Sequence, residues 1–336
     1  REFMSKQLCE VFEGKAGIEG LTSAKLQDRA IAEAKASVGL FPADALFAVA
    51  AVDVGSGKFD VSFRAFDLEA RSWWLDRFTI RQRLWPDGVL RDIRTRERIE
   101  DWSVLIEQVL LRQFPIEGRE DWAMPVAAVG IDIGDGNVTW KGREFARRAL
   151  LDGHFWGSAA SPWSRVRLLQ GSPSARASEL SAPRHIDRDE RNKLVKPAVP
   201  EYTVGAHVLK ELALERLAVS DGGPGQCWFA DGIASNYYDE YFNEPLIDGK
   251  FERQGPNESL DLFAYEEAVR LMLRPDRAIY NWSEPHLRPP WARPINLNPE
   301  GGDQAAPAEG ASAAPAVPQS KLSRFDALNR RPKPDG

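Results

Sequence analysis

Three acidic positions in this chain are placed where carboxylates could do chemistry together. Asp53 follows seven consecutive apolar residues and precedes a Gly-Ser-Gly turn, and Asp132 ends a second apolar run before a similar glycine turn. Asp261 lies near the start of a segment with helical periodicity, three residues after Glu258. Carboxylate oxygens are the ligands that Mg²⁺ and similar hard cations prefer. We therefore expect Asp53, Asp132 and Asp261 to converge on divalent metal ions.

The chemistry that such a site could support is phosphodiester hydrolysis. Two divalent ions about 3.5 to 4 Å apart can activate a water, neutralise phosphate oxygens and stabilise the leaving oxygen. If the strands that end at Asp53 and Asp132 are parallel neighbours, their carboxylates lie side by side at one edge of a sheet. Glu258 and Asp261 share a helix face because they are three residues apart, although Glu258 after Asn257 also suits an ordinary helix start.

The strands and helices that must position these side chains follow from hydrophobic periodicity. Apolar runs and alternation predict three strands with short loops, and hence antiparallel pairing, at 46–54, 58–67 and 72–80. The remaining elements are helices at 101–114, 140–151, 206–217 and 257–273, strands at 125–133 and 165–170, a short strand at 201–205 and an irregular segment at 171–200. Three antiparallel strands followed by alternating helices and strands predict an α/β fold with a mixed sheet flanked by helices, the order of an RNase H-like fold.

Composition divides the chain into three parts. Residues 1–43 have mixed composition with one helical stretch, and we interpret them as a tag remnant and an interdomain linker that carries a surface helix. Residues 44–274 contain the firm strands and helices and form the expected RNase H-like domain. Residues 275–336 are rich in proline, and their low-complexity part at 301–318 predicts a largely disordered C-terminal tail.

The overall charge gives no reason to expect nucleic-acid binding, but one segment does. The 336 residues carry a net charge of −6, with a sequence pI near 5.5. Between residues 165 and 196, eight Arg or Lys stand against four acids, which leaves a local charge of about +4. We predict that this segment and the following helix contact DNA phosphates through Arg184, Arg188, Arg191, Lys193 and Lys210.

The cysteine and histidine content argues against other kinds of site. The two cysteines, Cys9 and Cys227, form no disulfide framework, which suits a reducing compartment, and the four histidines are scattered without zinc-ligand spacing. No apolar run approaches the roughly 18 to 20 residues that a membrane span requires, so we expect no membrane segment.

Several short motifs of this sequence occur together in one known family. They are Ala51-Val-Asp53-Val-Gly55, Trp74-Leu-Asp76, Ile131-Asp132-Ile-Gly134, Val204-Gly205 with Lys210, and Asn257-Glu258-Ser-Leu-Asp261 with Tyr265. With these motifs, the chain resembles the nuclease domain of the phage terminase large subunit, of the lambda-like branch, over residues 20–275. The Asn-Glu-x-Leu-Asp helix start is the most specific of the motifs.

The resemblance implies an RNase H-like endonuclease that cuts concatemeric double-stranded viral DNA during genome packaging. It implies two ions of Mg²⁺ or Mn²⁺, held by Asp53, Asp132 and Asp261, with Glu258 as a further candidate ligand. The implied partners are double-stranded DNA, the small terminase subunit, and the portal of the procapsid through the C-terminal tail, in the host cytoplasm. Because no Gly-x-x-x-x-Gly-Lys-Ser/Thr motif occurs, the family's packaging ATPase domain is not expected in this chain.

Two alternatives fit the same residues. The turns after Asp53 and Asp132 are similar to the phosphate-binding turns of actin-like and sugar-kinase ATPases, although only 79 positions separate the two aspartates. The other alternative is a noncatalytic module of the same fold that docks onto DNA or the capsid. Metal-dependent DNA cutting that disappears in Asp53→Asn would separate the nuclease from both alternatives.

Overall fold

A computed structural model of the chain describes residues 20–298. The first half comprises α2 (Ser23–Glu33), β1 (Phe47–Gly55), β2 (Lys58–Phe66), β3 (Ser72–Ile80), β4 (Gln82–Leu84), β5 (Leu90–Asp92), the 3-10 helix η2 (Ile99–Ser103), the π-helical turn η3 (Ile106–Leu110), β6 (Gln113–Ile116) and β7 (Arg119–Asp132). The second half comprises α3 (Gly136–Leu151), β8 (Phe155–Ser158), β9 (Ser161–Ser164), β10 (Val166–Gly171), β11 (Arg184–Arg188), β12 (Leu194–Val204), α4 (Ala206–Ala218), β13 (Cys227–Trp228), α5 (Ser235–Asp239), β14 (Leu246–Ile247), β15 (Lys250–Phe251), α6 (Glu258–Leu273), the short 3-10 turns η4 (Pro285–Leu287) and η5 (Pro290–Ala292), and β16 (Ile295–Asn296).

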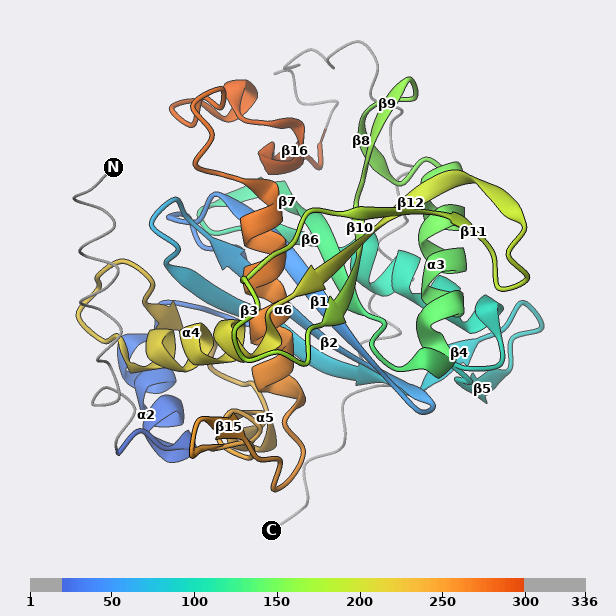
Figure 1. Ribbon diagram of the computed structural model, residues 1–336. Coiled ribbons are helices and arrows are strands. Elements are labelled where there is room, and N and C mark those ends of the chain that lie inside the picture. The colour runs from blue at the N-terminus through green and yellow to red at the C-terminus, as the bar shows by residue number, and fades with distance from the viewer. Residues whose placement is uncertain (1–19, 299–336) are drawn as a thin grey trace.

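A mixed sheet forms the centre of the protein (Figure 1). Its main path runs β11-β12-β10-β7-β1-β2-β3-β13, and β6 and β16 pair with the first part of β7, which gives ten strands. Strand β2 is antiparallel to both of its neighbours, β1 and β3, whereas β1, β7, β10 and β12 are parallel to one another. The predicted mixed α/β sheet flanked by helices is therefore confirmed.

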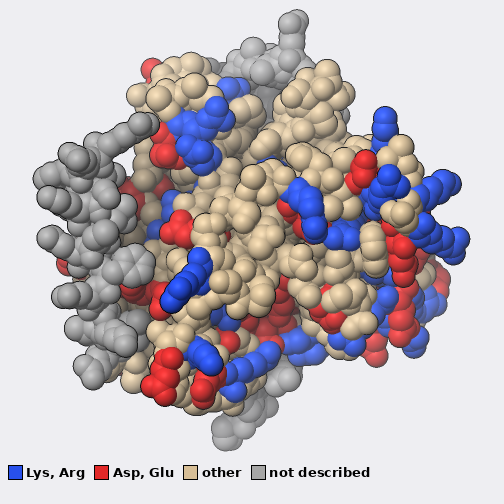
Figure 2. All heavy atoms as spheres, in the orientation of Figure 1, with Lys and Arg blue, Asp and Glu red and all other residues tan. Residues whose placement is uncertain are grey.

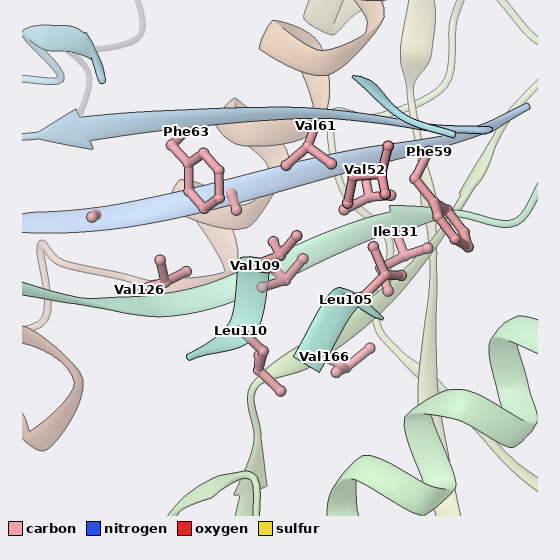
Figure 3. Packing of buried hydrophobic residues seen from close by; sticks show 14 of the residues in the cluster. Val52, Phe59, Val61, Phe63, Leu105, Val109, Leu110, Val126, Ile131 and Val166 are labelled. Carbon is pink, nitrogen blue, oxygen red and sulfur yellow. The ribbon is translucent and has the colours of Figure 1, made fainter. Parts of the chain in front are cut away.

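One face of the sheet carries the larger hydrophobic core. Figure 3 shows Val52, Val61 and Ile131 from the sheet close to Leu105 and Val109 from the segment of η2 and η3, and all five belong to one buried cluster. Helix α3 covers the same face. Because β1 is buried on both faces, its sequence is a continuous apolar run rather than an alternation.

Helix α6 crosses the other face, in front of the strands in Figure 1, and packs beside α4. Gly130 in β7 allows a close approach, because a Cβ there would lie 2.8 Å from Val269 of α6 and from Leu169 of β10. In the middle of α6, the buried Glu266 accepts a hydrogen bond from Arg64 Nε of β2 at 2.8 Å. Removing one partner of such a buried ion pair is strongly destabilising, so this contact fixes the helix on the sheet.

The helix predicted at 101–114 is found over 99–110, where the 3-10 helix η2, two α-helical residues and the π-helical η3 follow one another without a break. It ends earlier than predicted, and Phe114 enters β6, where it pairs with Met124 of β7. Trp102, Leu105 and Val109, which predict the helix, are buried in it. Pairing of β6 with β7 satisfies backbone groups at the end of the segment that a longer helix would have used.

The segment 171–200, predicted to be irregular, contains an antiparallel hairpin of β11 and the first part of β12. The short strand predicted at 201–205 is the end of β12, which begins at Leu194. Most hairpin side chains are exposed. Because neither face of the hairpin needs an apolar row, the sequence carries no alternation from which these strands could be predicted.

Residues 275–298 pack onto the sheet beside β7. The ring of Trp291 lies 5.3 Å from that of Phe47, centroid to centroid, and β16 pairs with β7. The low-complexity part of the predicted tail and the first 19 residues lie outside the described part of the chain, so the three-part division stays a prediction. Within 20–298, none of the helices combines the length and apolar character of a membrane span.

Candidate functional site

The carboxyl ends of β1 and β7 bring Asp53 and Asp132 to one edge of the sheet. The two strands are parallel and pair Val52 with Ile131, so the aspartates that follow are neighbours. Val52 and Ile131 belong to the core on the far face, and alternation therefore turns both aspartates toward α6. In β2, Asp60 pairs directly with Asp53 and points to the same face.

Helix α6 supplies the second half of the site. Its first turn carries Glu258 and Asp261, and the hydroxyl of Tyr265 one turn later donates to Asp132 Oδ2 at 2.8 Å. The other oxygen of Asp132 accepts from the backbone N–H of Gly134 at 2.8 Å. The helix thus orients Asp132 while adding its own carboxylates. In Figure 2, acidic atoms gather in the lower half of the face, over the region where Figure 1 places the start of α6.

The carboxylates of Asp53, Asp132 and Asp261 lie close enough to repel one another. Burial and the negative charges of Asp132 and Asp261 raise the pKa of Asp53 to about 7. Burial raises the pKa of Asp261 to about 6, although the charge of Lys210 opposes this shift. Burial also raises the pKa of Asp132. The structure therefore brings together the three acids singled out in the sequence, and their charges are incompletely balanced.

A second group of acids adjoins the first. One carboxylate oxygen from each of Asp53, Asp60 and Glu258 lies within 4.8 Å of the others, so these residues could share a cation. Lys58 Nζ now contacts two of them, at 2.6 Å from Asp60 Oδ2 and 3.2 Å from Glu258 Oε1. Burial alone would raise the pKa of Asp60, but the charges and hydrogen bonds of Arg77 and Lys58 lower it.

Sequence reasoning missed Asp60. In the sequence it alternates with Phe59 and Val61, which places it on the polar side of a half-buried strand. In the fold this side is covered by α6, and Asp60 is 2% exposed. The available signal was the short hairpin between β1 and β2, whose register places Asp60 opposite Asp53.

Lys210, predicted to bind DNA, lies inside the site. Its Nζ is 2.5 Å from Glu244 Oε2 and 2.7 Å from Asp261 Oδ1, and its side chain is 10% exposed. Asn257 Nδ2 donates to the same two carboxylates, at 2.6 Å and 2.8 Å. Burial would lower the pKa of Lys210, but the charge of Asp261 and the hydrogen bonds to both acids raise it. The lysine therefore stays charged and holds Asp261 in place.

The other four residues predicted to bind DNA lie together on the β11–β12 hairpin. Arg184 and Arg188 belong to β11, Arg191 and Lys193 lie in the turn, and all four are exposed. Arg184 forms an ion pair with Glu201 of β12. Strand β10 stands between this hairpin and β7, so these cations are set apart from the acidic centre along the sheet.

The donor set at the sheet edge fits a hard divalent cation. Carboxylate oxygens come from both the sheet and α6, and the four side-chain charges that act most strongly on Asp53 are negative. Within the described residues, the buried Oδ1 of Asn257 has no hydrogen-bond partner. A divalent ion would supply the positive charge that the carboxylates lack, and it would invert the effect of their mutual repulsion.

The fold and the site define an α/β protein with a polyacidic centre at the carboxyl edge of a mixed sheet. Residues 1–282 match the terminase large subunit gpA endonuclease domain, and the chain belongs to this family. The predicted family is confirmed, and with it a DNA-cutting role in genome packaging, whereas the lambda-like branch stays a prediction. No match was found among curated proteins or among solved structures.

Proposed function

We propose that this domain cuts concatemeric double-stranded viral DNA at the centre formed by Asp53, Asp132 and Asp261, with two Mg²⁺ or Mn²⁺ ions. The observation that carries the proposal is the unbalanced charge around Asp53, whose pKa is raised by burial and by neighbouring acids. Such a cluster destabilises the fold unless a cation binds it. The order of the central strands and the crossing helix support an RNase H-like assignment.

The ligands divide between the sheet and the helix. Asp53, Asp132 and Asp261 would hold the ions, with Glu258 and Asp60 as further ligands on the side of β2. When bound, the ions would neutralise phosphate oxygens and lower the pKa of a water. A bound ion would then join Asp53 and Asp132 of the sheet to Asp261 of the helix, as Lys58 joins Asp60 to Glu258.

Residues around the ligands set their orientation. Tyr265 and the backbone of Gly134 each donate to one oxygen of Asp132. Lys210 and Asn257 hold Asp261 from the side of α4 and from the start of α6. Partners of this kind change metal affinity or activity by about 10- to 100-fold when they are removed.

DNA would reach this centre along the basic face of the β11–β12 hairpin. Arg184, Arg188, Arg191 and Lys193 would contact backbone phosphates there, and Lys210 would approach the phosphate that is cut. The family suggests further partners, namely the small terminase subunit, the portal of the procapsid through the C-terminal tail, and a packaging ATPase domain outside this chain. The setting would be the host cytoplasm.

Plasmid cutting by the full chain in Mn²⁺ or Mg²⁺ tests the proposal. Asp53→Asn keeps the shape of the side chain but removes its charge, so the cutting rate should fall by at least about 10³-fold, or about 4 kcal/mol. DNA binding should persist. Asp152→Asn, at the exposed end of α3, is the matched control and should cut like the wild type. A wild type that cuts in neither metal would contradict the proposal, and ATP affinity in its place would favour the actin-like alternative.

A further inference from the structure

A second basic element stands beside the acidic centre, outside the sequence motifs. Strands β4 and β5 form a hairpin within residues 81–98, which we call the arginine hairpin. It contains six arginines and three acids, a charge of +3 in a chain whose net charge is −6. We propose that the arginine hairpin is a DNA-binding arm that contacts the phosphate backbone of the duplex cut at the acidic centre.

The arginine hairpin is attached to the turns that follow β1 and β7. Thr95 Oγ1 donates to the carbonyl of Gly55, at the end of β1, at 2.8 Å. Arg96 forms an ion pair with Asp135, in the turn after β7, at 2.7 Å. Gly55 and Asp135 stand two and three residues after the aspartates of the site. A duplex bound at those aspartates therefore passes beside the arginine hairpin.

Three guanidinium groups of the arginine hairpin surround one tryptophan. Arg83, Arg91 and Arg98 lie 5.2, 5.0 and 5.5 Å from the ring centre of Trp85. Cation–π contact with an indole restricts a guanidinium but leaves its N–H edges available to phosphate oxygens. The tryptophan thus reduces the conformational entropy that the arginines would lose when DNA binds.

Two arginines of the hairpin are free to bind an anion. Arg91, Arg94, Arg96 and Arg98 each have a carboxylate partner. Within residues 20–298, Arg81 and Arg83 form no ion pair. Arg81 is exposed and Arg83 is half-buried against Trp85. These two side chains are therefore the expected phosphate contacts, because no internal ion pair has to be broken.

The position of the arginine hairpin favours DNA over an acidic protein as its partner. An acidic protein would also match the charge, and it could cover Leu84, Val89 and Leu90, which are exposed near the tip. The hairpin, however, is fixed to the same sheet edge as the acidic centre. Figure 1 draws α3 between the arginine hairpin and the β11–β12 hairpin, and Figure 2 shows basic atoms, mixed with acidic ones, along this side of the molecule. Two basic hairpins on one side suit a long polyanion.

The inference rests on the proposed function, and its test separates the two. Duplex binding is measured by fluorescence anisotropy against salt in the Asp53→Asn background, which prevents cutting. Arg81→Gln with Arg83→Gln should lower the slope of log affinity against log salt by about 1 to 2, since each lost phosphate contact removes about 0.9. Affinity at low salt should fall about tenfold.

The matched control is Lys35→Gln with Arg277→Gln. Both residues are exposed and follow α2 and α6, so the control makes the same charge change away from the acidic centre and should keep the original slope. Equal slopes in the two double variants would overturn the arginine hairpin inference and leave the proposed function standing. The inference would also be overturned if Arg81→Gln with Arg83→Gln lost binding to polyglutamate, the probe for an acidic protein, and bound DNA as before. A wild type that neither binds nor cuts duplex DNA would remove both proposals.

Discussion

Helix α6 carries two groups of buried carboxylates whose surroundings differ. At its start, Asp261 joins the aspartates of the sheet and pairs with Lys210. The strongest side-chain charges that act on Asp53 are negative. In its middle, Glu266 pairs with Arg64, and Glu267 pairs with arginines from α4 and from α6 itself. Within residues 20–298, Asp53 and Asp132 of this centre form no ion pair, whereas Glu266 and Glu267 each pair with an arginine.

The two groups of carboxylates on α6 differ in what they do, since one suits ligand binding and the other stabilises the fold. Burial raises the pKa of Glu266 as it raises that of Asp53, but the charge of Arg64 opposes the shift at Glu266. Perturbed acids without a cation partner are more typical of functional sites. We infer that the start of α6 is adapted to bind a ligand and the middle of α6 to hold the helix on the sheet.

The largest expected effect concerns the paired carboxylates in the middle of α6. Glu266→Gln leaves the fully buried Arg64 without its anion, which should lower the free energy of unfolding by about 3 to 5 kcal/mol. Glu258→Gln, at the start of the same helix, is the control. It should change stability by less than about 1 kcal/mol, because Lys58 keeps its contact with Asp60. Urea unfolding measures both, and equal losses would contradict the comparison.

An effect of similar size and opposite sign is expected at the acidic centre. The pKa of Asp53 is about 7 in the fold, above its ordinary value of 3.8. Folding therefore favours the protonated acid, and the protein without metal loses stability as the pH rises from about 4 to about 7. Asp53→Asn removes this loss, so the variant should be more stable than the wild type by up to about 4 kcal/mol near pH 8 and by almost nothing near pH 4.

Urea unfolding in EDTA across this pH range measures the difference between Asp53→Asn and the wild type. Asp152→Asn, which stands away from the centre, should have the same free energy of unfolding as the wild type at every pH. A difference between Asp53→Asn and the wild type that does not grow with pH would mean that the carboxylates do not repel one another in solution.

The smallest expected effect concerns a single hydroxyl. Tyr265→Phe removes the donor to Asp132 Oδ2 and should weaken Mn²⁺ binding about tenfold, because Asp132 is then less well oriented. Tyr238→Phe is the control, since its buried hydroxyl donates to the carbonyl of Ala230, away from the acids. Calorimetric titration with Mn²⁺ compares them, and equal affinities would show that Tyr265 has no part in orienting Asp132.

The acids of the sheet edge were predictable because local sequence marks the ends of buried strands. Asp53 and Asp132 each follow an apolar run and precede glycine, and parallel pairing then makes them neighbours. Asp261 was predictable from the helix start that it shares with Asn257 and Glu258. In each case the signal lies within a few residues of the acid itself.

Other parts of the fold could not be predicted because they depend on distant partners. The alternation of Asp60 with Phe59 and Val61 places it on the polar side of its strand, and only α6, almost 200 positions later, covers that face of the sheet. Glu244 comes from a connecting segment and reaches Lys210 only in the folded chain. The helical segment of η2 and η3 ends before its predicted bound, and only the pairing of β6 with β7 shows why it ends there.

The absent side chain at Gly130 has a consequence for the chemistry. Because side-chain atoms of Val269 and Leu169 fill the space that a Cβ would need, a methyl group at this position would have to displace one of these side chains. Val269 belongs to α6, so a displacement that moved the helix would also move its acids away from those of the strands. The small size of residue 130 therefore contributes to the spacing across which the two halves of the centre would share a cation.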